Sequence, residues 1–227
     1  MKFLLLTLAL LGDPATGPSP LPAATAQEIA ASLQTGSILA SKGDCLAVRA
    51  YSLSSYTHVA TVVMQNGQPM VYDTVPGTGV RRLPLSDYLI SQQPTDIQLL
   101  HPTKPFSPTQ ATAFEKHLQA QIGRPYDVKH FATGRRCNGL HCSEYLTDAL
   151  IASQHLTSTN PARVSPSDLV TSLTDHQVYQ TGTTHNLPEP PAPPAPVSTT
   201  WYGQAWQGTK SCTYDCWVQT RRWFCCK

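Results

Sequence analysis

Charged side chains are scarce in this chain of 227 residues, of which only 13% are Asp, Glu, Lys or Arg. The formal net charge of +2 is too small to indicate a protein that binds nucleic acid, because such proteins concentrate positive charge. Hydrophobic residues make up 41% of the chain, which is enough for one packed domain of ordinary size with appendages. No internal repeat is visible along the sequence.

A long hydrophobic run is also missing. The apolar stretch Phe3–Leu11 is too short to span a bilayer and has the length of the apolar part of a signal peptide. Small residues at Ala24–Ala26 predict cleavage before Gln27, so residues 1–26 are expected to be a signal peptide, and the protein to be secreted or periplasmic without a membrane span. An uncleaved anchor or a short buried segment is the alternative. No cysteine directly follows the apolar stretch, which argues against a bacterial lipoprotein.

Tryptophan is absent until the last segment, residues 201–227, which contains all four: Trp201, Trp206, Trp217 and Trp223. Residues 185–200 are rich in proline and are predicted to be an extended linker, because proline favours the polyproline conformation and cannot build a core. Residues 201–227 are therefore predicted to be a separate small module. Its basic and aromatic side chains suit attachment to a cell wall or another polyanionic glycan. The alternative is a structural knot packed on itself or on the main domain.

The chain has seven cysteines: Cys45, Cys137, Cys142, Cys212, Cys216, Cys225 and Cys226. An odd number in an exported protein leaves either a free thiol or a bond to another molecule. The last four are expected to form two disulfides, because so short a module cannot be stable on a core alone. A zinc site is the alternative, but the adjacent Cys225 and Cys226 are poorly placed as two ligands of one tetrahedral metal. No cofactor is expected.

The main domain is predicted to span residues 27–184 and to be built from a sheet followed by helices. Strands are expected at residues 44–50, 58–64, 68–75 and 95–102, and helices at residues 27–33, 107–123, 139–156 and 165–173. This order predicts an α+β fold rather than alternating strands and helices. The Asn66-Gly67 pair lies between the second and third strands and predicts a type I′ hairpin turn.

The hairpin places a histidine near a carboxylate. With a two-residue turn, Ala60 faces Asp73, so His58 and Asp73 share a sheet face as diagonal neighbours. A carboxylate at this position would hold the imidazole in one tautomer and make it a better base. Taken singly, His58 could be a hydrogen-bonded core residue and Asp73 an edge residue, although Asp is uncommon within strands.

Cys142 stands where a loop passes into a predicted helix. The partial positive charge and free N–H groups of a helix N-terminus favour a thiolate and can stabilise an oxyanion. A thiolate beside a histidine is the arrangement for attack on a carbonyl carbon through an acyl-enzyme. A buried core cysteine is the simpler explanation for Cys142 taken alone. His141 and His130 are the other histidines that could serve it as a base.

Five segments together resemble the permuted NlpC/P60 papain-like proteins, in particular the YiiX-like branch. They are "GDCLAVRA", "SSYTHVATVV", "VYDTVPGTGVRRLPLSDYL", "IGRPYDVKHF" and "LHCSEYLTDAL", within residues 36–172. The resemblance implies a circularly permuted papain-like fold, with an antiparallel sheet packed against helices. It implies that Cys142 is the nucleophile, His58 the general base and Asp73 the orienting residue, where relatives have glutamate. Tyr126, the tyrosine of the "PYD" segment, would line the site and contact substrate.

The resemblance also implies an activity. It suggests a secreted cysteine hydrolase that cuts an amide bond, most directly in peptidoglycan stem peptides, through a thioester. The expected partners are peptidoglycan or another cell-wall polymer and, for a toxin, an immunity or inhibitor protein. One alternative is a lipid acyl hydrolase or acyltransferase that uses the same pair of residues, and the other is a non-catalytic glycan-binding protein. Cys45 and Cys137 could pair or both be free, and Cys142 would be the unpaired seventh cysteine.

Overall fold

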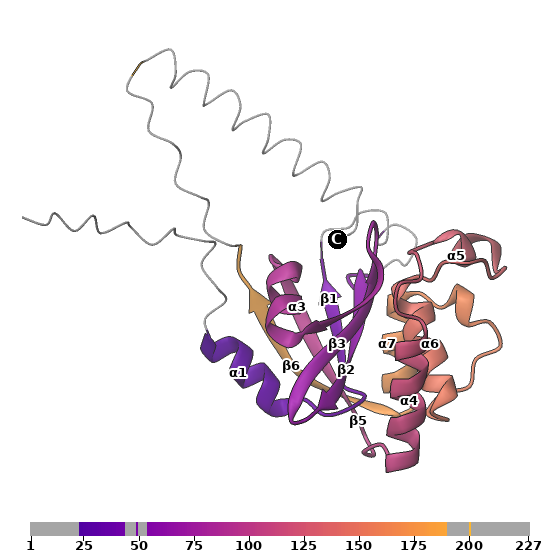
Figure 1. The fold of residues 1–227 in the computed structure, drawn as a ribbon, viewed down its shortest axis with the longest axis horizontal. Helices are drawn as coiled ribbons and strands as arrows, with labels where there is room; N and C mark the ends of the chain where they lie inside the picture. Colours follow the sequence, from indigo (N-terminus) through magenta and orange to yellow (C-terminus); the bar gives the residue numbers. More distant parts are fainter. Residues whose placement is uncertain (1–22, 44–48, 50–53, 190–199, 201–227) are drawn as a thin grey trace, which may run out of the picture.

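The computed structural model describes residues 23–43, 49, 54–189 and 200. The predictions for residues 1–22, for most of the proline-rich linker and for the tail therefore lie outside the described residues. The same holds for Cys45 and for the four cysteines of the tail. Within the described residues, a central sheet is covered by α1 and α3 on one side and by α4, α6 and α7 on the other (Figure 1).

In the described part of the chain, the sheet has six strands in the order β4-β3-β2-β1-β5-β6, and all neighbours are antiparallel. The strands are β1 (Ile38–Lys42), β2 (His58–Gln65), β3 (Gln68–Val75), β4 (Gly79–Pro84), β5 (Thr95–Pro102) and β6 (Tyr179–Leu187). The α-helices are α1 (Ala23–Ser32), α3 (Leu85–Gln92), α4 (Pro108–Ala120), α5 (Lys129–Thr133), α6 (Cys142–Ala152) and α7 (Pro166–Asp175), and a 3-10 turn, η1, covers Pro161–Arg163. The fold is therefore α+β, as predicted.

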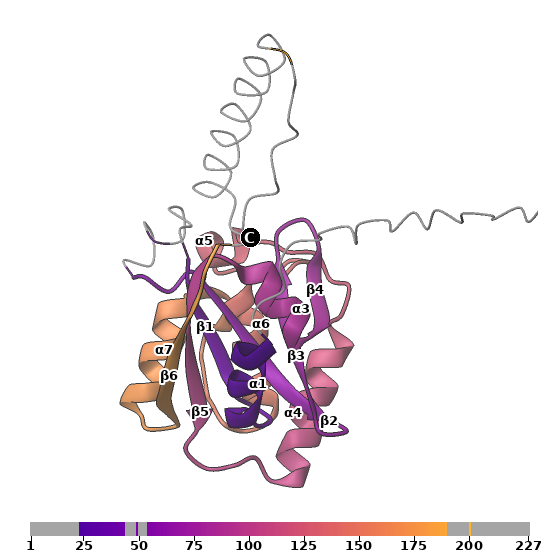
Figure 2. The same cartoon turned by 90° about the vertical axis from the view of Figure 1, so that its left-hand side faces the viewer.

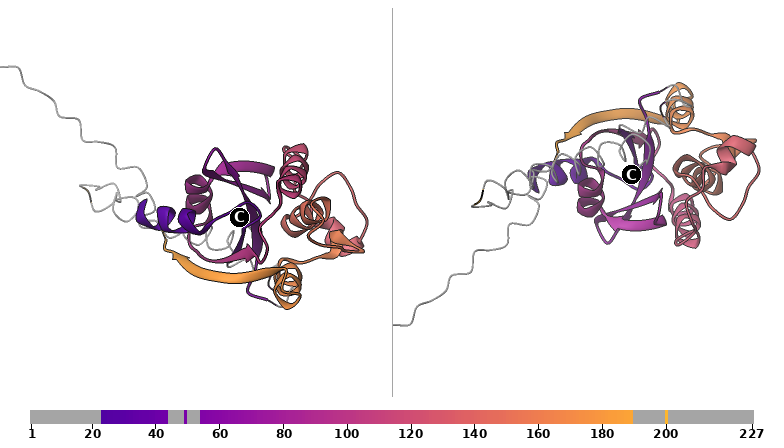
Figure 3. Two further views of the ribbon diagram at one scale, coloured as in Figure 1. Left: turned by 90° about the horizontal axis from the view of Figure 1, so that it is seen from below. Right: turned by 90° about the horizontal axis from the view of Figure 1, so that it is seen from above.

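Each face of the sheet has its own core. Val59 and Val63 of β2 belong to the cluster that includes α4, α6 and α7, whereas Ala60 and Val62 belong to the cluster with α1 and α3. This division follows from the alternation of side chains along a strand. Figure 2 shows α1 in front of the sheet, and Figure 3 shows the helices on both sides of it when the molecule is seen from either end. Because both faces of β2 are covered, the strand is apolar along most of its length.

The predicted hairpin between β2 and β3 is confirmed. Asn66 and Gly67 have φ angles of 50° and 76°, and two positive values are what a type I′ turn requires. Gln65 pairs with Gln68, and Thr61 pairs with Tyr72. This is the register that brings His58 and Asp73 together. The starts of α4 and α7 are also as predicted, each with a serine capping box followed by proline.

The structure differs from the prediction at the ends of the domain. The first strand is β1, not residues 44–50, of which the only described one, Arg49, is helical. The prediction lacks β4, α3 and β6. The strands β4 and β6 lie at the two edges of the sheet. β6 is also largely exposed and polar, so its sequence carries no apolar pattern. β6 ends at Leu187, beyond residue 184, and the predicted cleavage point before Gln27 falls inside α1.

The segment that follows α4 is tied to the edge strand β4. The amide of Val80 donates to the carbonyl of Arg124 at 2.8 Å, and the amide of Gly123 donates to the carbonyl of Val80 at 2.9 Å. The Arg124 guanidinium in turn donates to the carbonyls of Asn138 and Cys137, at 3.0 and 3.3 Å. One arginine thus connects the sheet edge to the loop that enters α6.

Alanine substitutions at two glycines test the contact between β4 and Arg124. Gly77 and Gly79 both have positive φ angles, 81° and 79°, so alanine is strained at either position. At Gly79 a Cβ would also collide with the Arg124 carbonyl, whereas at Gly77 it would meet nothing within 4 Å. We expect Gly77→Ala to lower the free energy of unfolding by about 1 kcal/mol and Gly79→Ala by about 2–4 kcal/mol. Urea denaturation measures both values, and equal losses would contradict the role of the Arg124 contact.

Candidate active site

The N-terminus of α6 is capped by a histidine. His141 Nδ1 accepts a hydrogen bond from the backbone N–H of Glu144 at 3.3 Å, and Nε2 donates to the carbonyl of Ala162 at 2.9 Å. Burial lowers the pKa of His141, which keeps the ring neutral in this role. Both ring nitrogens therefore hold the helix start in place. His141 is adjacent to Cys142 in sequence but is committed to helix capping rather than to a role as base.

Cys142 is the first residue of α6 and is nearly buried, with 5% of its surface exposed. Its thiol lies near the imidazole of His58 and the backbone N–H groups of Val59 and Ser143, which lower its pKa through charge and hydrogen bonding. Burial alone would raise the pKa of Cys142, but the charge of His58 and these hydrogen bonds outweigh it and lower the pKa below that of an ordinary thiol. The site therefore favours a thiolate.

His58 is the first residue of β2 and is also nearly buried. Burial by itself favours the neutral ring, but the Cys142 thiolate and the Asp73 carboxylate outweigh burial and raise the pKa of His58 to about 10. Nε2 of His58 lies 3.3 Å from Oδ2 of Asp73. Near neutral pH the two side chains thus form a thiolate–imidazolium pair, with a carboxylate behind the imidazolium.

Asp73 is held by a second partner that the sequence analysis did not identify. Arg81 lies opposite Asp73 in the β3–β4 register. Its Nε is 2.8 Å from Oδ1 and its Nη2 is 3.1 Å from Oδ2. Burial would raise the pKa of Asp73, but His58 and Arg81 lower it, so the side chain is a carboxylate. The short "PGTG" turn after β3 was the signal that could have indicated a second hairpin and hence this pair.

Tyr126, His130 and Cys137, the other residues named in the sequence analysis, have different contacts. Tyr126 forms an isolated parallel bridge with Leu140, two residues before Cys142, and its contact with substrate stays a prediction. His130 does not serve Cys142, because its Nε2 lies 2.6 Å from the sulfur of Cys137. Cys137 is a free, exposed thiol in the structure. Its pairing with Cys45 stays a prediction, since Cys45 lies outside the described residues.

Neither a metal centre nor a membrane helix is found in the described part of the chain. No group of three or more His, Cys, Asp or Glu side chains there is arranged to hold a metal ion. None of the helices described is long and apolar enough to cross a bilayer. The tail cysteines considered above as alternative zinc ligands fall outside these residues.

A sheet histidine that contacts a cysteine at a helix N-terminus is the arrangement of a papain-like cysteine hydrolase. Residues 32–181 match the family of permuted papain-like amidases described as YaeF/YiiX, C92, and the chain belongs to this family. A similar solved structure is the crystal structure of metalloprotein yiiX from Escherichia coli O157:H7. It is 18% identical, has a TM-score of 0.47, and is aligned over 71% of this chain and 89% of that one. No curated protein matches the sequence. The match to the family model confirms the resemblance inferred from the sequence.

The first prediction for this site concerns the reactivity of Cys142. We expect Cys142 to react with iodoacetamide near neutral pH, because its pKa is held below the ordinary thiol value of about 8.5. His58→Ala removes the positive charge and leaves burial to act, so the midpoint of the pH–rate profile should move up to the ordinary range or above it. Peptide-resolved mass spectrometry gives the alkylation rate at each pH.

His176→Ala is the matched control for this experiment. His176 is an exposed histidine at the end of α7 and has no part in the cluster. Its replacement should leave the Cys142 profile unchanged. A profile that is the same in wild type and in His58→Ala would refute the thiolate–imidazolium pair.

The second prediction concerns Arg81. Arg81→Met leaves the buried Asp73 carboxylate with His58 as its remaining charged partner, and breaking such a pair costs about 3 kcal/mol of unfolding free energy. The neighbouring Arg82 points to the other side of β4 and contacts Gln65, so Arg82→Met should cost less than about 0.5 kcal/mol. Urea denaturation compares the two variants. Similar losses in both would show that Arg81 does not stabilise Asp73.

Proposed function

We propose that the protein is an exported cysteine amidase that cleaves an amide bond in peptidoglycan stem peptides. The observation that carries the proposal is the contact between the Cys142 thiol and the His58 imidazole at the N-terminus of α6, with Asp73 behind the imidazole. The family of permuted papain-like amidases supports the class of bond. The short apolar N-terminal run and the basic, tryptophan-rich tail support export and a cell-wall substrate.

The first chemical step is attack on the amide. The Cys142 thiolate forms a bond to the carbonyl carbon, and the carbonyl oxygen takes the negative charge. The positive end of the α6 dipole lies at Cys142, where it favours this oxyanion. The helix thus stabilises both the resting thiolate and the tetrahedral intermediate.

The second step releases the amine. The C–N bond breaks as the His58 imidazolium donates its proton to the leaving nitrogen, which leaves an acyl thioester on Cys142. His58, now neutral, takes a proton from a water molecule that attacks the thioester, and the carboxylic acid departs with regeneration of the thiolate. Asp73 holds the ring orientation throughout. Amidase activity should fall above pH about 10, where His58 has lost the proton that the amine needs.

Tyr126 is proposed to contact the substrate, because it lies beside the segment that leads into Cys142. Peptidoglycan, or another polymer of the cell wall, is the proposed partner of the whole chain. If the enzyme acts on the wall of another cell, an immunity or inhibitor protein would protect the producer.

Digestion of purified peptidoglycan tests the proposal. The wild type should release muropeptide fragments cut at one amide bond, and Cys142→Ala should release none. His58→Ala should retain activity reduced by about 10²–10⁴-fold, because it lacks the general acid and base. Arg82→Met is the matched control with an intact site. Mass spectrometry of the products identifies the bond.

Two outcomes would overturn this assignment. Equal release by wild type and Cys142→Ala would show that Cys142 is not the nucleophile. An inert wild type on peptidoglycan, together with Cys142-dependent release of fatty acid from a lipid ester, would instead assign acyl-ester hydrolysis to the same site.

A further inference from the structure

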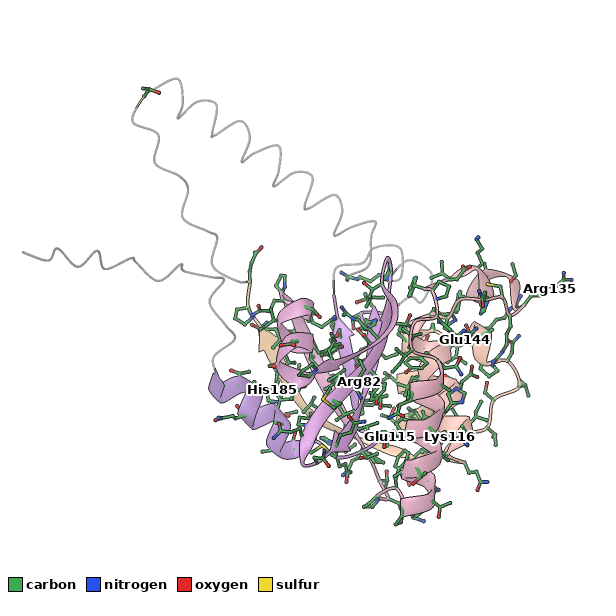
Figure 4. The ribbon with its side chains drawn as sticks, in the orientation of Figure 1. Arg82, Glu115, Lys116, Arg135, Glu144 and His185 are labelled. Atoms are coloured by element: carbon green, nitrogen blue, oxygen red, sulfur yellow. The ribbon has the colours of Figure 1, made fainter. Side chains whose placement is uncertain are left out.

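A second cluster of thiol, imidazole and carboxylate lies on another side of α6. His130 of α5 is fully buried, and its Nδ1 is 2.7 Å from Oε2 of Glu144, which is fully buried as well. Its Nε2 is 2.6 Å from the sulfur of Cys137, an exposed free thiol in the loop between α5 and α6. Figure 4 shows Glu144 at the end of α6 that lies nearest α5. The mechanism proposed above uses none of these three side chains.

The hydrogen bonds determine which nitrogen of His130 carries the proton. Nδ1 faces the Glu144 carboxylate, so Nδ1 bears the proton and donates it. Nε2 accepts a hydrogen bond from the backbone N–H of Cys137, which requires a lone pair on that nitrogen. Both contacts select the same tautomer. The lone pair of Nε2 therefore faces Cys137 and is shared between its backbone N–H and its sulfur.

Three basic side chains surround Glu144: His130, Arg136 and His141. Oε1 accepts no hydrogen bond from the residues described and lies 3.8 Å from Nε of Arg136. Oε2 also lies 3.7 Å from Nε2 of His141, the cap of α6. A buried carboxylate needs such partners to remain in the fold. His130 is the closest of them, so the carboxylate and the imidazole orient one another.

We propose that Cys137 is a second reactive thiol, with His130 as its base, and that small-molecule disulfides modify it by thiol–disulfide exchange. Its exposure allows a reagent to reach the sulfur, whereas His130 and Glu144 are shielded from water. At rest the Cys137 thiol donates a hydrogen bond to Oδ2 of Asp127 at 3.4 Å, and this carboxylate opposes a thiolate. The role of His130 is therefore to accept the proton as the sulfur attacks.

The exchange balances without another reactant. The Cys137 thiol gives its proton to Nε2 of His130, and its sulfur attacks one sulfur of the disulfide. The S–S bond of the reagent breaks, a mixed disulfide forms on Cys137, and the other half of the reagent leaves as a thiolate. The released thiolate is the reduced product. It takes up the proton that His130 then loses to the solvent.

The two thiols can be measured separately. Cys142 contacts His58 of β2 and Cys137 contacts His130 of α5, so each has its own histidine. The full chain is treated briefly with the disulfide dithiobis(nitrobenzoate) at neutral pH, the remaining thiols are alkylated, and peptide-resolved mass spectrometry gives the rate at each cysteine. We expect Cys137 in the native protein to react at least about tenfold faster than in the same protein unfolded in urea.

Substitution then identifies the base. His130→Gln should lower the Cys137 rate by at least about tenfold and leave the Cys142 rate within about twofold of wild type. His176→Gln is the matched control and should change neither rate. Since His130 is buried, its substitution could impair folding, and the comparison of native with unfolded wild type tests the proposal without any substitution.

Three results would overturn the proposal. The first is a native Cys137 rate no higher than the rate in urea. The second is an unchanged Cys137 rate in a folded His130→Gln variant. The third is a disulfide between Cys137 and another cysteine of the chain, found before the reagent is added. None of these results depends on cleavage of peptidoglycan, so they leave the proposed amidase function untouched.

Discussion

The site depends on one buried carboxylate. Asp73 is 1% exposed and can remain ionised only because His58 and Arg81 pair with it. The three residues come from the adjacent strands β2, β3 and β4, so the sheet register decides whether the charges meet. A slip of one residue in β3 would turn Asp73 to the opposite face and separate it from both partners. The hairpin turn that sets the register is thus a condition for the pairing of these three side chains.

The first turn of α6 is the second element on which the molecule depends. Its N–H groups and its histidine cap place Cys142 where a thiolate is favoured, next to the imidazolium that β2 supplies. Two residues later, Glu144 leaves the same turn in another direction and orients His130 toward Cys137. One helix end therefore supports two thiol clusters of similar composition. They differ in burial, since Cys142 is nearly enclosed and Cys137 is exposed.

Much of the fold around Cys142 could be predicted because its signals are local. The Asn66-Gly67 turn has one favoured geometry, and counting from it brings His58 near Asp73. Serine caps followed by proline mark the starts of α4 and α7. The edge strands β4 and β6 could not be predicted, because their exposed faces carry no apolar alternation, and Arg81 lies on β4.

The sequence by itself determined the elements whose cause lies within a few residues: the hairpin and its register, the capped helices, and a cysteine at a helix mouth. Only the tertiary structure decided which histidine lies beside which thiol. His141 and His130 are nearer to Cys142 in sequence than His58 is, yet His141 caps the helix and His130 faces Cys137. The reason is that the His58 contact arises where α6 packs against β2. The His130 contacts arise where α5 and the loop after it pack against α6. Such distances follow from packing of the whole domain, and sequence separation does not encode them.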